Sequence, residues 1–220
     1  MQIRHTDFNG AGALFADSLA KEWRQIELTL IELSLHLKAS DQASIQGRLI
    51  FDPVGTNAAI KTGLEGTHHW SSNVPMPHEF RCLGKGFDFA HNGVLVEVQF
   101  SNYPFLLNNT VRAELVFKSR TLMAGTPVGA LVIISKANMF PASNSTLYYE
   151  QGVNQLVELS RNGVFDVPTR MVGLFSDIGM VDAVCTNYHA LRYSRTVVEQ
   201  TIKRVDISGT PPSRCRIVLA

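Results

Sequence analysis

Two acidic residues, Asp88 and Glu97, stand symmetrically about the dipeptide Asn92-Gly93 in the stretch GFDFAHNGVLVEVQFS, residues 86–101. Asn-Gly between apolar-rich runs predicts a two-residue hairpin turn of type I′, because both central residues of that turn need positive φ. The turn fixes the pairing, so the two acids face each other on one side of the sheet with Cβ atoms roughly 5 Å apart. Gln99 lies on the same face, because side chains alternate along a strand.

Two carboxylates and an amide on one face indicate a metal site. Like charges that face each other destabilise a sheet unless a positive charge lies between them, and a hard divalent cation prefers oxygen ligands. A second interpretation stays open at this point. Both acids fit equally the exposed, solvated side of an amphipathic hairpin, as most such pairs do, and a one-residue bulge would separate them.

The elements that position this hairpin can be predicted from hydrophobic spacing. Trp23, Ile26, Leu30, Leu33 and Leu37 form one apolar stripe, which predicts a helix from Phe15 to Leu37. VGALVIIS, residues 128–135, is a strand buried on both faces. The remaining segments are expected to form a short helix (57–64), a loop (67–79), a helix or a strand (111–117), a helix (148–159) and a strand (169–175).

Strands interleaved with helices predict an α/β or α+β fold around a mixed sheet. A chain of 220 residues fits one sizeable domain, and neither a repeat nor an inter-domain linker interrupts it. No apolar run is long enough to span a membrane, and the N-terminus lacks the apolar core of a signal peptide. The three cysteines have no paired spacing. We therefore expect a cytoplasmic protein with free thiols at Cys82, Cys185 and Cys215.

The formal net charge of +1 is unevenly distributed. The segment 192–220 holds six basic and two acidic residues, hence +4, which leaves −3 for the rest of the chain. A local basic surface of this kind can neutralise phosphates, although an ordinary solvated C-terminal segment explains the charge equally well. The sequence contains no Walker loop, GxGxxG, GxSxG or HExxH motif. The adjacent His68 and His69 would point apart, as expected for a loop pair rather than for metal ligands.

An acid, a strand-length gap and then acid-X-polar is the layout of the PD-(D/E)XK nuclease superfamily, and it reads here as Asp88 followed by Glu97-Val98-Gln99. The motif is weak by itself, but its context is specific. In register over most of its length, the chain closely resembles the BglII-like branch of the type II restriction endonucleases. The resemblance is carried by HLKASDQAS (36–44), RLIFDPVGTN (48–57), LVEVQFSNYPFLLNNTVR (95–112), MFPASNSTLYYEQ (139–151) and RYSRT (192–196). It weakens in the first twenty residues, at 118–129, at 176–191 and at the C-terminus.

The resemblance implies a restriction-endonuclease-like α/β core with a central mixed β-sheet flanked by helices, plus a smaller β-rich subdomain. Residues 1–220 would form a single domain, with DNA-wrapping β elements inserted and in its C-terminal part. It also implies a homodimer that uses Mg²⁺, with Mn²⁺ as a substitute, to cut both strands of double-stranded DNA. The expected site is a GATC-centred palindrome, AGATCT cut after the first A, leaving 5′-phosphates and four-base 5′ overhangs. The outer base pair is either fixed or degenerate.

Site residues follow from the resemblance position by position. Asp88 is the expected main metal ligand, joined by the backbone carbonyl of Val98 and, through water, by Glu97. Glu97, Gln99 and Asn73 would orient the attacking water. The superfamily usually has lysine at the position of Gln99 and proline at that of Phe87, and both departures are shared with the BglII-like branch. Glutamine cannot take a proton at neutral pH, so water activation would depend on the metal.

DNA contacts are expected from three segments and one supporting residue. Asparagine suits adenine because its amide offers one donor and one acceptor to N6 and N7. The residues expected to contact DNA are Ser101, Asn102, Arg112, Asn144, Ser145, Tyr193 and Arg195, with Arg112 supporting the groove-facing segment.

Two rival functions are compatible with the same scaffold. A non-cleaving, sequence-specific DNA-binding protein is the first, although the intact set of Asp88, Glu97 and Gln99 argues against it. A metal-dependent phosphodiesterase for small nucleotides is the second, and it predicts a closed pocket rather than an open cleft. Plasmid cleavage with Mg²⁺ distinguishes all three.

Overall fold

The structure, a computed structural model, describes residues 1–143, 146–191 and 194–220. Its helical segments are α1 (Ala11–Ala16), α2 (Ala20–Ile31), η1 (Ala43–Ile45), α3 (Pro53–Lys61), η2 (Thr62–Thr67), η3 (His78–Leu83), α4 (Pro104–Lys118) and α5 (Tyr149–Arg161). Its strands are β1 (Gln2–Phe8), β2 (Leu35–Ala39), β3 (Leu49–Phe51), β4 (Ser71–Pro75), β5 (Gly86–His91), β6 (Val94–Val98), β7 (Leu122–Met123), β8 (Thr126–Pro127), β9 (Ala130–Lys136), β10 (Thr169–Phe175), β11 (Gly179–Tyr188), β12 (Val197–Ser208) and β13 (Arg216–Leu219).

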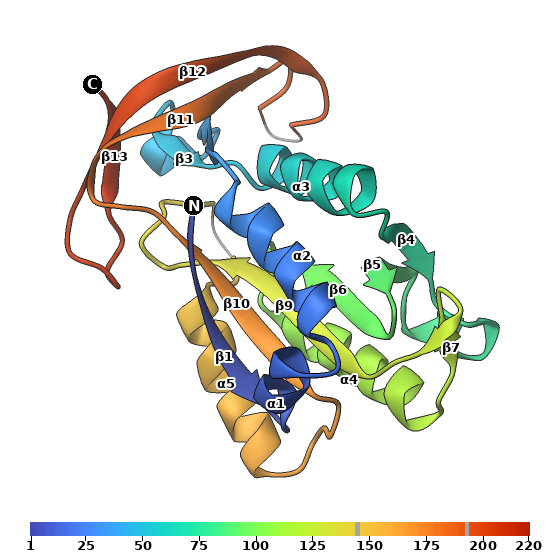
Figure 1. The fold of residues 1–220 in the computed structure, drawn as a ribbon. Helices are drawn as coiled ribbons and strands as arrows, with labels where there is room; N and C mark the ends of the chain where they lie inside the picture. Colours follow the sequence, from blue (N-terminus) through green and yellow to red (C-terminus); the bar gives the residue numbers. More distant parts are fainter. Residues whose placement is uncertain (144–145, 192–193) are drawn as a thin grey trace.

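A six-stranded mixed sheet, in the order β1-β10-β9-β6-β5-β4, forms the centre of the molecule (Figure 1). Strands β6, β9 and β10 are mutually parallel, whereas the other pairs are antiparallel. Every residue of β9 is buried, as the continuous apolar run predicted. The mixed α/β fold expected from the sequence is confirmed, since helices alternate with the strands of this mixed sheet.

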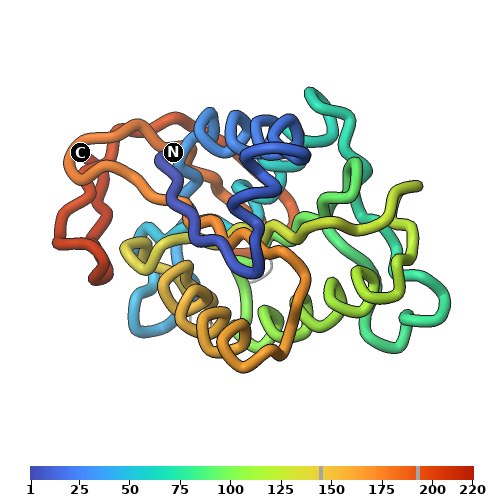
Figure 2. Tube along the Cα trace, turned by 60° about the horizontal axis from the view of Figure 1, so that its bottom comes forward, coloured from blue at the N-terminus to red at the C-terminus, as the bar shows by residue number. Residues whose placement is uncertain are grey.

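Helices cover both faces of this sheet, with α1 and α2 on one face and α4 and α5 on the other (Figure 2). Alternation along β9 divides the core accordingly. Val132 and Ile134 pack with Ile26 and Leu30 of α2, and neighbouring positions of the strand pack with α4 and α5. None of the described helices is long and apolar enough to cross a membrane.

The hairpin of β5 and β6 forms in the predicted register. Asn92 has φ 44° and Gly93 has φ 85°, and Phe89, Ala90 and His91 pair with Val96, Leu95 and Val94. The regular ladder ends at Phe89–Val96, one pair before the two acids. A ladder that stops there leaves the acids free to make side-chain contacts instead.

The prediction of one helix from Phe15 to Leu37 was wrong at both ends, because Phe15 belongs to α1 and α2 runs only from Ala20 to Ile31. The stripe of Trp23, Ile26 and Leu30 is buried as expected, but the helix ends at Ile31, and Leu37 lies in strand β2. β2 is almost wholly buried between β11 and β3. Leu37 continues the helical spacing by coincidence, because a strand buried on both faces has no periodicity of its own.

Two other segments differ from prediction or resolve an alternative. Residues 67–79, expected as a loop, contain β4 and the start of η3. β4 is an edge strand paired only with β5, and an edge tolerates proline because one side needs no hydrogen-bond partners. Residues 111–117 are helical, within α4. The short helix, the α5 helix and the β10 strand were placed correctly.

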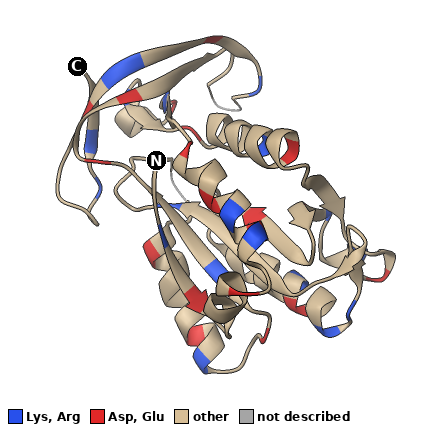
Figure 3. Cartoon of the chain, viewed as in Figure 1, with Lys and Arg blue, Asp and Glu red and all other residues tan. Residues whose placement is uncertain are grey.

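A second sheet, in the order β13-β12-β11-β2-β3, packs beside the first and shares its core. Basic residues predicted to form a local surface lie exposed on its outer strands, where Lys203 and Arg204 belong to β12 and Arg216 to β13 (Figure 3). Arg204 pairs with Asp182 of β11 at 3.6 Å. The three cysteines, all within the described residues, form no disulfide, so the prediction of free thiols is confirmed.

We expect Gly86→Ala to destabilise the fold, because a Cβ at Gly86 would lie 2.1 Å from the carbonyl oxygen of Val74 on β4. Overpacking of this kind costs about 1–3 kcal/mol, measurable by urea denaturation. Gly66→Ala is the matched control, since a Cβ there meets no atom within 4 Å. Equal free energies of unfolding for the two variants would contradict the close approach of β4 and β5.

Candidate active site

Asn73, Asp88 and Val98 line one small hollow of about 170 Å³, where β4, β5 and β6 lie side by side. Helix α3 contributes Asn57 and Lys61 to its wall. Asn73 has φ 51°, a left-handed conformation that asparagine adopts more readily than most residues. It lies between the two ladder pairs that flank Asp88. Three residues expected to act together are therefore neighbours in space.

The carboxyl groups of Asp88 and Glu97 are hydrogen-bonded to each other. Burial raises the pKa of Glu97 well above its usual range, and the negative charge of Asp88 raises it further. Burial also raises the pKa of Asp88, while the hydrogen bond that its Oδ2 accepts from the Val98 N–H at 2.7 Å lowers it. The pKa values of both acids are thus raised, that of Glu97 the more strongly. The alternative of two solvated surface acids does not fit Glu97, which is 6% exposed.

The donors in this hollow suit a hard cation that keeps part of its water shell. They are oxygen atoms of the Asp88 carboxylate, the Asn73 amide and the backbone, which magnesium and manganese prefer. Among the described residues, no group of three or more His, Cys, Asp or Glu side chains could hold a metal. A site with so few acidic ligands suits an ion that completes its coordination with water and substrate oxygens.

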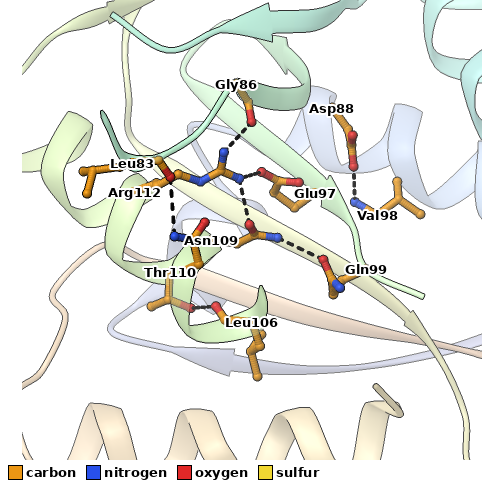
Figure 4. A network of polar contacts seen from close by, with 11 residues as sticks. Leu83, Gly86, Asp88, Glu97, Val98, Gln99, Leu106, Asn109, Thr110 and Arg112 are labelled. Carbon is orange, nitrogen blue, oxygen red and sulfur yellow. Dashed lines mark hydrogen bonds and ion pairs between the residues drawn. The ribbon is translucent and has the colours of Figure 1, made fainter. Parts of the chain in front are cut away.

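Arg112 of α4 lies beneath Glu97 (Figure 4). Its Nη2 donates to Glu97 Oε1 at 2.5 Å and to Asn109 Oδ1 at 2.7 Å, and its Nη1 donates to the carbonyl oxygen of Gly86 at 2.7 Å. Its guanidinium stacks over the ring of Phe87. The side chain is 8% exposed, so it is buried within this network, and its support of the groove-facing segment stays a prediction. Arg112 holds the carboxyl group of Glu97 in place.

Gln99 is held on both sides of its amide. Its Oε1 accepts from Asn109 Nδ2 at 3.2 Å, and its Nε2 donates to Ser101 Oγ at 3.2 Å and to the Asn102 carbonyl oxygen at 3.3 Å. A chain of contacts thus runs from Glu97 through Arg112, Asn109 and Gln99 to the loop after β6 (Figure 4). Neither Gln99 nor Glu97 lines the hollow, whereas Asp88 does.

Asn109 was missed by the sequence analysis. The available signal was its spacing from Arg112, three residues along a predicted helix that follows the acidic strand, because residues three apart share one helix face. The segment was left open between helix and strand, and the spacing is meaningful only for a helix. The buried amide joins two expected site residues that do not contact each other directly.

The expected DNA contacts fall into three groups. Ser101 and Asn102 are exposed directly after β6, and they line a hollow of about 150 Å³ with residues that precede α5. Arg195 is exposed between β11 and β12. Asn144, Ser145 and Tyr193 lie outside the described residues.

Comparison with known proteins shows similarity over the whole chain. The sequence model of the restriction endonuclease BglII/BglIII family matches residues 3–174. The type II restriction enzyme BglII of Bacillus subtilis is 51% identical over 219 residues, which are 98% of this chain and 96% of the relative. The crystal structure of BglII complexed with a DNA 16-mer matches with a TM-score of 0.93 at 48% identity. Free BglII matches with a TM-score of 0.78 at 44% identity. Both structural matches cover all of each chain.

We expect Asn109→Ala to lower the rate of DNA cleavage, the activity expected from the sequence, by about tenfold. It removes one acceptor from Arg112 and the donor that holds Gln99, each hydrogen bond being worth about 1 kcal/mol. Asn108→Ala is the control, because the exposed Asn108 amide makes a long 3.4 Å hydrogen bond to the Leu83 carbonyl oxygen. Single-turnover rates measure both variants. Equal rates would show that the network does not position the site.

Proposed function

The chain belongs to the BglII/BglIII family of restriction endonucleases, and we propose that it cleaves both strands of AGATCT after the first A. It is a type II site-specific deoxyribonuclease, and this class generally uses divalent metal ions. The products would carry 5′-phosphates and four-base 5′ overhangs. The hydrogen-bonded carboxyl groups of Asp88 and Glu97, of which Asp88 lines a hollow with Asn73 and Val98, are the observation that carries the proposal.

Mg²⁺ is the proposed cofactor, and Mn²⁺ would substitute because it accepts the same oxygen ligands. Asp88 and the backbone carbonyl of Val98 would hold it, with Glu97 reaching it through water. When bound, the ion polarises a phosphate oxygen and lowers the pKa of water in its shell. A cation beside the two carboxyl groups would also offset the repulsion between their charges.

The protein's own groups would place the attacking water in line with the bond to the 3′ oxygen. Glu97, fixed by Arg112, would offer a carboxylate oxygen to the water. Asn73 projects from β4 at the same hollow and would add a hydrogen bond. Gln99 cannot act as a base at neutral pH. Its proposed contribution is to hold the Ser101–Asn102 loop and the water network in register.

Different residues would set the affinity for DNA and the recognition of its sequence. Contacts to phosphate fix the register, whereas contacts to base edges specify sequence. We assign base contacts to Ser101, Asn102, Asn144 and Ser145, and contacts near the duplex backbone to Tyr193 and Arg195. The whole of residues 1–220 would act as one nuclease domain, with the five-stranded sheet helping to surround the duplex.

A homodimer follows from the twofold symmetry of a palindrome, because each subunit then reads one half-site. Helix α4 and the residue before it carry an exposed apolar stripe at four-residue spacing, formed by Tyr103, Leu107 and Val111, which are 47%, 43% and 45% exposed. Phe105, which is 49% exposed, lies beside it. An apolar stripe on a solvent-facing helix suits burial against the same stripe of a second copy. We propose α4 as part of the dimer interface.

Incubating plasmid and linear DNA with the protein and Mg²⁺ tests the function. We expect discrete fragments, and sequencing their ends should give AGATCT cut after the first A. Asp88→Asn should abolish cleavage while retaining specific binding, and chelation of the metal should do the same to the wild-type protein. Specific binding without cleavage by the wild-type protein would support a non-cleaving DNA-binding protein. Hydrolysis of small nucleotide esters but not of DNA would support the phosphodiesterase.

We expect Leu107→Glu to shift the protein from dimer to monomer, because it places a charge in the centre of the apolar stripe. Sedimentation equilibrium measures the shift, and double-strand cleavage should weaken most at low protein concentration. Leu122→Glu is the control, since Leu122 is 59% exposed on β7 and belongs to no part of this stripe. A Leu107→Glu variant that stays dimeric would exclude α4 from the interface.

A further inference from the structure

Lys136, the last residue of β9, is 1% exposed, and the proposed chemistry does not use it. Its Nζ donates to the carbonyl oxygen of Phe100 at 2.9 Å, to that of Leu147 at 3.3 Å and to the hydroxyl of Thr146. An ammonium has three donors and no acceptor, so each of the three can have its own partner. The three acceptors are therefore arranged as the charged head group of a lysine requires.

Aromatic rings surround the same nitrogen. It lies 5.1 Å from the ring centroid of Tyr148, 5.7 Å from that of Phe51 and 5.8 Å from that of Phe100. Burial and, to a smaller extent, the nearby charge of Arg214 lower the pKa of Lys136 to about 7. The ring faces and the three oxygen acceptors act in the opposite direction, because both favour the cation. Placing an amine here is costly, and an apolar side chain of the same length would avoid that cost.

The three acceptors belong to the two segments that follow the parallel strands β6 and β9. Phe100 directly precedes Ser101 and Asn102, and Thr146 and Leu147 directly follow Asn144 and Ser145. Parallel neighbours end at the same edge of a sheet, so both segments leave it close together.

Two further contacts join these segments without the lysine. The Thr146 hydroxyl donates to the Phe100 carbonyl oxygen at 2.7 Å, and the Leu147 N–H donates to the Ser101 carbonyl oxygen at 3.0 Å. Lys136, at the end of β9, contacts both segments from within the sheet. Together these contacts form a junction that sets the spacing between the two segments.

We propose that Lys136 is a positioning residue for base recognition, which fixes the spacing of the loop at 101–102 against the loop that ends at Thr146. The inference rests on the proposed function, in which these two loops carry the base contacts. Base edges discriminate through hydrogen bonds of defined geometry, each good contact being worth about a tenfold or larger preference for the correct base. Loosening the junction would therefore weaken discrimination more than it weakens the chemical step, whose groups lie around Asp88.

The test compares Lys136→Met with wild-type protein on AGATCT and on duplexes that differ from it by one inner or one outer base pair. Methionine keeps the length and apolar stem of the side chain but donates no hydrogen bond. We expect the preference for AGATCT, measured as a ratio of kcat/KM values, to fall about tenfold or more. The change should appear as a raised KM for AGATCT, with the single-turnover rate at saturating DNA within a few-fold of wild type. Lys136→Arg should recover part of the preference, because it restores charge and donors.

Thr146→Val is a second variant that removes one acceptor and leaves the lysine in place, and it decides the matter if Lys136→Met does not fold. It should lower the preference in the same direction by a smaller factor. Arg170→Met controls for general loss of a buried cation. Arg170 is 4% exposed, pairs with Asp7 at 2.6 Å and lies over the ring of Trp23. It lies at the beginning of β10, and its loss should lower thermal stability without changing the preference.

The outcomes separate this inference from the proposed function. If the wild-type protein cleaves AGATCT and both Lys136→Met and Thr146→Val discriminate as well as wild type, the positioning role is wrong. An equal loss of preference in Arg170→Met would also overturn it, because the effect would then follow from stability. Absence of specific cleavage by the wild-type protein would instead contradict the proposed function.

Discussion

The buried guanidinium of Arg112 is the interaction on which the site depends. Two carboxyl groups in hydrogen-bond contact repel when both are ionised, and burial makes each charge more costly. Arg112 lies within 2.5 Å of Glu97 and compensates this repulsion from the side opposite Asp88. Its other contacts, to Gly86 and Asn109, tie the same charge to β5 and to α4. The acids therefore keep one geometry before any cation arrives.

Helix α4 connects this arrangement to the proposed subunit interface. One face of the helix carries Asn109 and Arg112, which hold Glu97 and Gln99. The opposite, exposed face carries Leu107 and Val111, proposed to meet a second subunit. The helix is 15 residues long and begins with Pro104 at its first turn, where proline is accommodated without losing an intrahelical bond. A rigid helix with one face in the site and one in the proposed interface would link dimer formation to the position of the acids.

Much of the site could be predicted because its geometry is local. Asn-Gly specifies the turn, the turn specifies the register, and the register places Asp88 against Glu97 without reference to the rest of the chain. Asn109 and the role of Arg112 could not be predicted in this way, since they depend on how α4 packs under the sheet. The boundary after Ile31 failed for a related reason. The spacing of Leu33 and Leu37 fits a helical stripe. A strand buried on both faces, such as β2 around Leu37, has no alternation that would contradict this spacing.

Strands β6 and β9 end at the same edge of the sheet, which affects how such a protein can acquire a new DNA recognition sequence. The two loops that leave this edge are linked through backbone carbonyls, the Thr146 hydroxyl and the side-chain amine of Lys136. An exchange of one loop alone would alter the length or path of a segment whose partner stays unchanged. New sequence preferences should therefore arise by replacing both segments together, so the unit of change is the pair of loops with the strand end between them.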